Sequence, residues 1–179
     1  MTSARAITFR PLVTEDLPMM HAWINTTHVA EWWDATPTLE DVSRKYAKRI
    51  AGEEPTRSFV IECDAHPIGY IQTYRIADYP EYAAQVAPGE NAAGVDLFIG
   101  DATQISHGTG SGVLTEFLRT IVFADESIDE CILGPEIKNQ RAIRCYEKVG
   151  FRYWKTVQIP GERAPEYLMR ITRSDLTQS

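Results

Sequence analysis

The chain has 179 residues, of which 44% are hydrophobic, and its formal charge is −7 at pH 7. An acidic surface repels phosphate backbones, so a nucleic-acid partner is not expected, whereas a small cationic substrate would be attracted. No stretch approaches the roughly 18 apolar residues of a membrane helix, and Met1–Arg10 lacks the apolar core of a signal peptide. We expect one cytoplasmic domain over 1–179, a monomer or weak dimer with no membrane partner.

The three cysteines are Cys63, Cys131 and Cys145. They are widely spaced among apolar neighbours and odd in number, which predicts buried free thiols rather than a disulfide framework. No pair has zinc-ligand spacing with histidine, so we expect no metal site.

The first half of the chain predicts a strand, two helices and a hairpin. Acidic residues after Thr14 favour a helix start, and Thr38 followed by Asp41 is a typical capping pair. The turn residues 64–67 separate two apolar runs and predict an antiparallel hairpin. The expected elements are a strand Ala6–Arg10, a helix from Thr14, a helix from Thr38 to about Ala51, and strands Ser58–Cys63 and Pro67–Arg75.

The second half begins with Ile76–Ala93, where two prolines and a glycine predict a long surface loop. Apolar residues at helical spacing predict a helix from Gly108 to roughly Asp125. The remaining expected elements are strands Gly94–Ile99 and Glu130–Leu133, a helix from Asn139 to Gly150, and strands Arg152–Gln158 and Glu166–Thr172.

A run of small residues opens the helix at Gly108. Small residues let the backbone approach a ligand closely, and the free N–H groups at a helix start bind phosphate oxygens. A flexible loop would have the same composition, and neither a P-loop nor a Rossmann fingerprint is present. The candidates for phosphate binding are Gly108, Thr109, Gly110, Ser111 and Gly112.

The last predicted helix carries the most specific string, Asn-Gln-Arg-Ala-Ile-Arg-Cys-Tyr-Glu-Lys-Val-Gly-Phe, at 139–151. Asn139 suits an N-cap and Gly150 suits the left-handed residue that ends a helix. Ala142, Ile143 and Tyr146 recur at helical spacing and mark one face. Such a unit could simply serve packing in any α/β protein.

This string resembles the closing motif of the GCN5-related N-acetyltransferases (GNAT). The resemblance implies an α/β (α+β) GNAT fold, with a mixed, mostly antiparallel sheet of about seven strands flanked by four helices. It also implies acetyl-CoA as co-substrate. The cofactor contacts that it implies are Phe98, Ile99, His107, the 108–112 loop, Asn139, Ala142 and Tyr146. The family's loop pattern matches Gly108 and Gly110 but departs at Ile105, where the family has Arg or Gln.

Acetyl transfer to an amine requires a deprotonated amine, a polarised thioester and a proton for the leaving thiolate. Asp96 lies within the apolar run Gly94–Ile99, where it is either a solvent-facing residue or the group that meets the amine. Tyr146 is either a packing residue or the acid that protonates the thiolate, and a tyrosine can do both. The resemblance assigns these catalytic roles to Asp96 and Tyr146.

Several stretches resemble the aminoglycoside 6'-N-acetyltransferases in particular, across about residues 7–172. They are His28–Trp33, Pro37–Val42, Pro67–Tyr74, Gly94–Asp96 and Arg141–Lys148. The resemblance implies transfer to the 6'-amine of aminoglycoside antibiotics, and therefore resistance. The expected substrate contacts are Trp32, Trp33, Gln72, Tyr74, Tyr82, Asp96 and Glu136.

Two departures weaken the choice of substrate. Those enzymes often have Asp where this chain has Gly134, and their substrate loop is rich in acids, whereas 76–93 has only Asp78, Glu81 and Glu90. The alternatives are a siderophore-type lysine N-acyltransferase or another small-amine acetyltransferase and, in a different class, a non-catalytic CoA-binding sensor.

Overall fold

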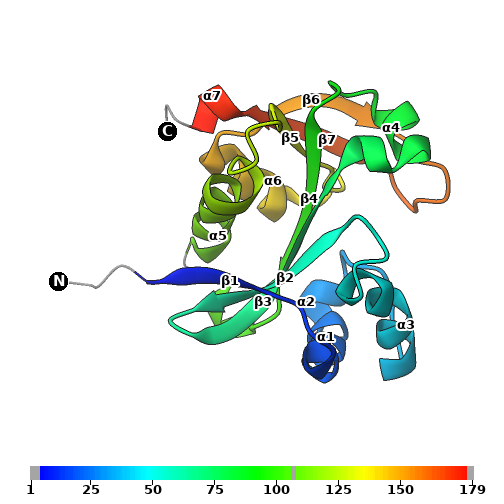
Figure 1. Ribbon diagram of the computed structural model, residues 1–179, viewed down its shortest axis with the longest axis vertical. Coiled ribbons are helices and arrows are strands. Elements are labelled where there is room, and N and C mark those ends of the chain that lie inside the picture. Colours follow the sequence, from blue (N-terminus) through cyan, green and yellow to red (C-terminus); the bar gives the residue numbers. More distant parts are fainter. Residues whose placement is uncertain (1–4, 106–107, 177–179) are drawn as a thin grey trace. The chain divides into compact units, whose positions relative to one another are not determined.

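The computed structural model describes residues 5–105 and 108–176 (Figure 1). Its seven strands form one sheet in the order β1-β2-β3-β4-β5-β7-β6. The strands are β1 Ile7–Pro11, β2 Arg57–Cys63, β3 His66–Arg75, β4 Ala92–Ile99, β5 Glu130–Leu133, β6 Arg152–Val157 and β7 Glu166–Thr172.

The sheet is mixed, as expected for the GNAT fold. β1 pairs with β2, and β7 pairs with both β5 and β6, in antiparallel register. β4 and β5 are parallel, with Ala92 opposite Glu130 and Gly94 opposite Ile132. A parallel pair needs a crossover connection, and α5 lies in the chain between these two strands.

The part of the chain that the structure describes has seven α-helices rather than four. The difference comes from α4, which was not expected, and from the single-turn helices α2 and α7. The α-helices are α1 Leu17–Ile24, α2 Thr27–Ala30, α3 Leu39–Ile50, α4 Pro80–Val86, α5 Thr109–Phe117, α6 Gln140–Val149 and α7 Arg173–Leu176. Short 3₁₀ turns are η1 Thr14–Asp16, η2 Ile76–Asp78 and η3 Ala102–Gln104, and η4 Leu118–Val122 is a π-helical turn.

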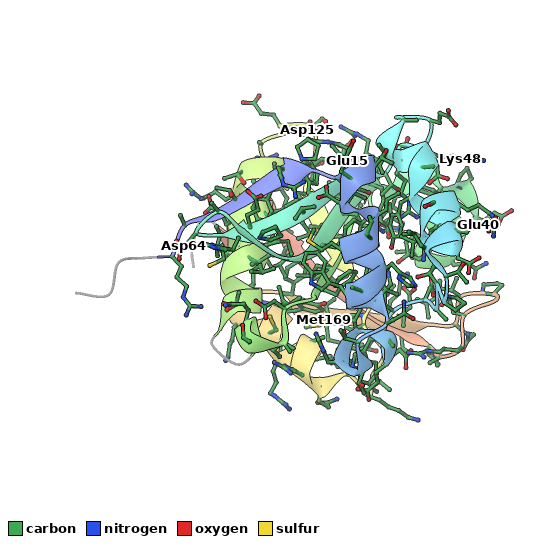
Figure 2. All side chains as sticks on the ribbon, turned by 90° about the horizontal axis from the view of Figure 1, so that it is seen from below. Glu15, Glu40, Lys48, Asp64, Asp125 and Met169 are labelled. Carbon is green, nitrogen blue, oxygen red and sulfur yellow. The ribbon has the colours of Figure 1, made fainter. Side chains whose placement is uncertain are left out.

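The chain divides into two compact units. The first unit contains 1–72 and 96–109, and the second contains 73–95 and 110–179. In the first, α1 and α3 pack side by side (Figure 1) and bury Met20, Val42 and Tyr46 completely. Figure 2 shows Glu40 and Lys48 on α3, and both are exposed. In the second, Ile76, Ala92, Ile132, Val86 and Leu168 form a buried cluster.

Local sequence signals explain the elements that were predicted correctly. The backbone N–H of Asp41 donates to Thr38 Oγ1 (3.1 Å), and the Thr38 N–H donates to the Asp41 carboxylate (3.2 Å), which completes a capping box for α3. Asp64 and Ala65 join β2 to β3 with φ of 51° and 64°. Two left-handed residues are what a tight two-residue hairpin turn requires.

The prediction of a long loop over Ile76–Ala93 is wrong. The segment folds as η2, α4 and the start of β4, and it buries Ile76 and Val86. Pro80 occupies the first turn of α4, where its missing N–H removes no helical hydrogen bond. Proline therefore starts a helix here, whereas the sequence reading treated it as a breaker.

Cys63 and Cys131 are buried, Cys145 is half-buried, and all three are free thiols. Among the described residues, no helix is long and apolar enough to cross a membrane.

Candidate functional site

Asp96 lies near the middle of β4 and accepts a hydrogen bond from a side chain of β3. Gln72 Nε2 donates to Asp96 Oδ2 at 2.8 Å. The amide oxygen of Gln72 accepts two hydrogen bonds, from Arg49 Nη1 (2.7 Å) and from the Tyr70 hydroxyl (2.7 Å). Asp96 is therefore one end of a side-chain network and not a solvated residue on an alternating strand.

Burial raises the pKa of Asp96, because a low-dielectric surrounding disfavours the charged carboxylate. The hydrogen bond from Gln72 and the positive charge of Arg49 act in the opposite direction. Asp96 nonetheless retains some exposed surface. A carboxylate of this kind gains stability in its ionised form when a cation binds beside it.

Aromatic side chains pack beside this network within the first unit. The Trp33 indole N–H donates to the Tyr46 hydroxyl at 3.1 Å, and its ring meets Phe98 edge-on at 4.9 Å between centroids. Phe98 is buried in the core, so its side chain is a packing group. His28 Nε2 lies 3.0 Å from the Ile99 carbonyl oxygen. Trp32 is half-buried.

The glycine run at the start of α5 has two structural reasons to be glycine. Gly108 has φ of +73°, which side-chain-bearing residues rarely adopt. A Cβ on Gly110 would lie 3.0 Å from Cys145 Sγ, so this glycine lets α5 approach α6 closely. Thr109 is buried, Ser111 is half-buried and Gly112 is exposed. His107, an expected cofactor contact, lies outside the described residues.

Helix α6 has the caps that the sequence predicted. Asn139 Oδ1 accepts a hydrogen bond from the Ala142 N–H at 3.1 Å, and Gly150 ends the helix with φ of 111°. Ala142 is half-buried. Tyr146 is also half-buried, with its ring centroid 6.2 Å from that of Phe151. Tyr146 therefore combines ring packing with partial exposure, as its acid role would require.

A second aromatic group gathers around Tyr74 in the second unit. A Cβ on Gly94 would lie 2.4 Å from the Tyr74 ring, so only glycine permits this approach. Tyr74 packs edge-on against Tyr79 (5.3 Å) and Tyr82 (6.4 Å). The Tyr82 hydroxyl donates to Glu166 Oε2 at 3.0 Å.

The glycine at 134 has a structural reason that the sequence did not reveal. A Cβ at this position would lie 2.3 Å from Glu166 Oε2, so the Glu166 carboxylate already occupies the space of a side chain. Glu136, an expected substrate contact, accepts a hydrogen bond from Arg163 Nε at 2.6 Å. The Glu166 carboxylate therefore lies beside Gly134, while Glu136, two residues further along the chain, is paired with Arg163.

Sequence reasoning missed Arg49, Tyr70 and Glu166. Tyr70 contacts Gln72 two residues away on the same strand, but Arg49 and Glu166 meet their partners Gln72 and Tyr82 across 23 and 84 residues. No local pattern marks such a residue. Within 5–105 and 108–176, no group of three or more His, Cys, Asp or Glu side chains could hold a metal ion.

The sequence matches the family model described as an acetyltransferase (GNAT) domain over residues 13–159. It is 32% identical over 160 residues to the aminoglycoside N(6')-acetyltransferase type 1 of Klebsiella pneumoniae, covering 87% of this chain and 78% of that protein. It is also 26% identical over 156 residues to the spermidine N(1)-acetyltransferase of Escherichia coli K12, covering 84% of this chain and 75% of that protein.

Solved structures of aminoglycoside acetyltransferases are also similar to this chain. The aminoglycoside acetyltransferase AAC(6')-Ib in complex with coenzyme A superposes with a TM-score of 0.87 at 30% identity, covering 97% of this chain and 99% of that chain. Its complex with coenzyme A and kanamycin superposes with a TM-score of 0.86 at 31% identity and the same coverage.

Proposed function

Because this chain belongs to the GNAT acetyltransferase family, we propose that it transfers the acetyl group of acetyl-CoA to the 6'-amine of aminoglycoside antibiotics. The main observation behind this proposal is that Gln72 holds the Asp96 carboxylate beside aromatic side chains. Asp96 lies in a segment that resembles the aminoglycoside enzymes. Those relatives are named for this reaction, and one of their structures holds kanamycin. The net charge of −7 favours a polycationic substrate.

Asp96 would bind the reacting amine as an ammonium ion. An amine is mostly protonated at neutral pH, and a carboxylate is a weak base toward it, so the ionic contact comes first and the proton is then lost to bulk solvent through a water relay. The free amine nitrogen then attacks the thioester carbon, and the C–S bond breaks as the nitrogen loses its second proton to solvent and the amide forms. Asp96 stays ionised throughout and holds the nitrogen in place.

Tyr146 would give its hydroxyl proton to the departing CoA thiolate and regain a proton from solvent. Its place on α6, one turn beyond Ala142, supports this role, because an i, i+4 pair lies on one helix face. Asn139 and Ala142 would contact the cofactor on that face. Asn139 already accepts a bond from the helix N–H, so its amide nitrogen is the group left for a ligand.

The backbone N–H groups at the start of α5 would bind the CoA pyrophosphate. A Gly110→Val protein tests this, but valine there would also press on Cys145 Sγ. The matched control is therefore Gly110→Val with Cys145→Ala, which removes the sulfur. We expect both proteins to lose CoA affinity in calorimetry. If the double variant binds CoA as tightly as Cys145→Ala alone, the pyrophosphate lies elsewhere.

A polyamine is the second candidate substrate, because the similarity to a spermidine acetyltransferase extends over 84% of the chain. Polyamines and aminoglycosides are both polycations, but only the aminoglycosides present sugar rings. Trp32, Trp33, Tyr74 and Tyr82 are the aromatic groups proposed to contact those rings.

One assay separates these possibilities. Thiol release from acetyl-CoA is followed with kanamycin, tobramycin, amikacin, gentamicin and spermidine, each at the same concentration. We expect the highest kcat/KM with an aminoglycoside that carries a 6'-amine. Faster release with spermidine would favour the polyamine reaction. If the protein binds CoA tightly but releases no thiol with any amine, lysine included, the non-catalytic CoA-binding sensor would be the favoured function.

A further inference from the structure

The hydrogen-bond network that holds Asp96 includes the side chain of Arg49, which contacts Gln72 and not Asp96 itself. Arg49, in the last turn of α3, donates from Nη1 to Gln72 Oε1 at 2.7 Å and from Nε to Glu54 Oε2 at 3.2 Å. Its side chain is only 17% exposed, and its guanidinium lies 5.3 Å from the centre of the Tyr46 ring. Arginine side chains are usually exposed, whereas these partners hold the Arg49 guanidinium in one orientation.

An amide side chain can turn over, exchanging its oxygen and its NH₂ group. At Gln72 three neighbours compete for these two ends, namely Arg49, Tyr70 and Asp96. The Tyr70 hydroxyl can donate or accept, since either oxygen of its 2.7 Å contact with Ser58 can supply the proton. Arg49 has only donors, so the amide end that faces it must be the oxygen. Arg49 therefore directs the NH₂ group of Gln72 at Asp96.

We propose that Arg49 is a positioning residue for amine binding, which acts through Gln72 to orient the Asp96 carboxylate. This role rests on the proposed function of Asp96 as the group that binds the ammonium ion. The Gln72 N–H occupies Asp96 Oδ2, which leaves Oδ1 for a cation. Turned over, the amide would present its oxygen to the carboxylate, and the two oxygens would repel each other.

The positive charge of Arg49 would repel a cationic substrate if no negative charge lay beside it. Glu54 accepts from the same guanidinium, so the pair is close to neutral at a distance. The other charges that act on Asp96 are Lys45 and Asp34, which form their own ion pair at 2.9 Å and affect its pKa in opposite directions. Burial raises the pKa of Tyr46 to about 12, so its ring stays neutral during turnover.

Removing Arg49 should therefore do two things. The amine-binding geometry loosens, and the pKa of Asp96 rises, since a neighbouring positive charge favours the carboxylate and its removal favours the acid form. Ammonium binding needs the ionised carboxylate, so the acid limb of kcat/KM moves to higher pH. By analogy with the outer partners of metal-ligating side chains, whose loss lowers activity by about 10- to 100-fold, we expect a loss of that order.

The test compares Arg49→Met, Arg49→Lys and a control, Arg44→Met. Arg44 lies on the same helix and forms exposed pairs with Glu40 and Asp41, so its loss removes a similar charge without touching the network. For Arg49→Met we expect a drop of about 10-fold or more in kcat/KM for the amine, an acid limb at higher pH, and an unchanged KM for acetyl-CoA. Arg49→Lys should recover part of the loss, because lysine still donates to the Gln72 oxygen. Arg44→Met should match the parent protein.

A titration of the Asp96 carboxyl carbon by ¹³C NMR, assigned with Asp96→Asn, tests the proposal without any turnover. The Asp96 pKa should be higher in Arg49→Met than in the parent, and close to the parent value in Arg49→Lys. An equal loss of activity at every pH, with the Asp96 titration unmoved, would mean that Arg49 only supports the fold and would overturn the proposal. If the parent protein acetylates no amine, the proposed function fails while the NMR result still decides the role of Arg49.

Discussion

Helix α6 is capped by residues close together in the sequence, whereas Asp96 is held by residues that are far apart in the sequence. The caps of α6 come from residues inside the helix or next to it, with Asn139 bonded to Ala142 three residues away and Gly150 at its end. Asp96 depends on Gln72, 24 residues away, and through it on Arg49. Caps that depend on near neighbours can be predicted from a sequence, whereas a network of distant residues becomes visible only in the fold.

The largest effect is expected at the Asp96 side. Asp96→Asn keeps the shape of the side chain and removes the charge proposed to bind the ammonium ion. We expect kcat/KM for the amine to fall by about 10²–10⁴-fold, while calorimetry shows unchanged CoA binding. Activity that returns at high pH, where the amine arrives deprotonated, would indicate that Asp96 acts as the base. Full activity of the variant from pH 6 to 9 would remove both roles.

The next effect is expected at α6. Tyr146→Phe keeps the ring packed near Phe151 and removes the proposed acid. We expect kcat to fall by about 10²-fold, near the lower end for general acid catalysis because water can replace the hydroxyl. Pre-steady-state thiol release separates chemistry from product release. An unchanged chemical step would show that another group protonates the thiolate.

The same comparison explains what could be predicted from the sequence. The hairpin at 64–65 and both helix caps follow from turn residues and periodicity, which are local, whereas the mixed sheet was expected from the resemblance to the family. The helix in 76–93 was missed because Pro80 and the short apolar set at 76, 82, 83 and 86 read as a loop. The residue behind Gln72 could not be predicted, because arginine in the last turn of a helix is normally a solvated, dipole-stabilising residue. The single domain, the oligomeric state and the roles of the site residues stay predictions.

The close contact between Gly134 and Glu166 can be tested by measuring the free energy of unfolding. An aspartate there would have to displace the Glu166 carboxylate, whose oxygen lies 2.3 Å from the new Cβ, and would add a like charge. We expect Gly134→Asp to lower the free energy of unfolding by about 1–3 kcal/mol in urea denaturation. Adding Glu166→Ala should recover most of this loss. If the two changes were simply additive, the carboxylate would not be the cause.

The smallest effects are expected at the helix caps, where the two units provide a matched pair. Thr38→Ala and Asn139→Ala each remove a side-chain cap, and each should lower the free energy of unfolding by about 1 kcal/mol. Only Asn139→Ala should also weaken CoA binding. Equal CoA affinity in the two variants would restrict Asn139 to its capping role.

The most direct measurement of the central claim is the position of the new acetyl group on kanamycin. The parent protein is incubated with acetyl-CoA and kanamycin, released thiol is counted, and the product is examined by two-dimensional NMR. We predict one acetyl group per thiol released, on the 6'-nitrogen, with no product from Asp96→Asn at the same pH. Acetylation at another amine, or no acetylated kanamycin while spermidine is acetylated, would contradict the proposed function.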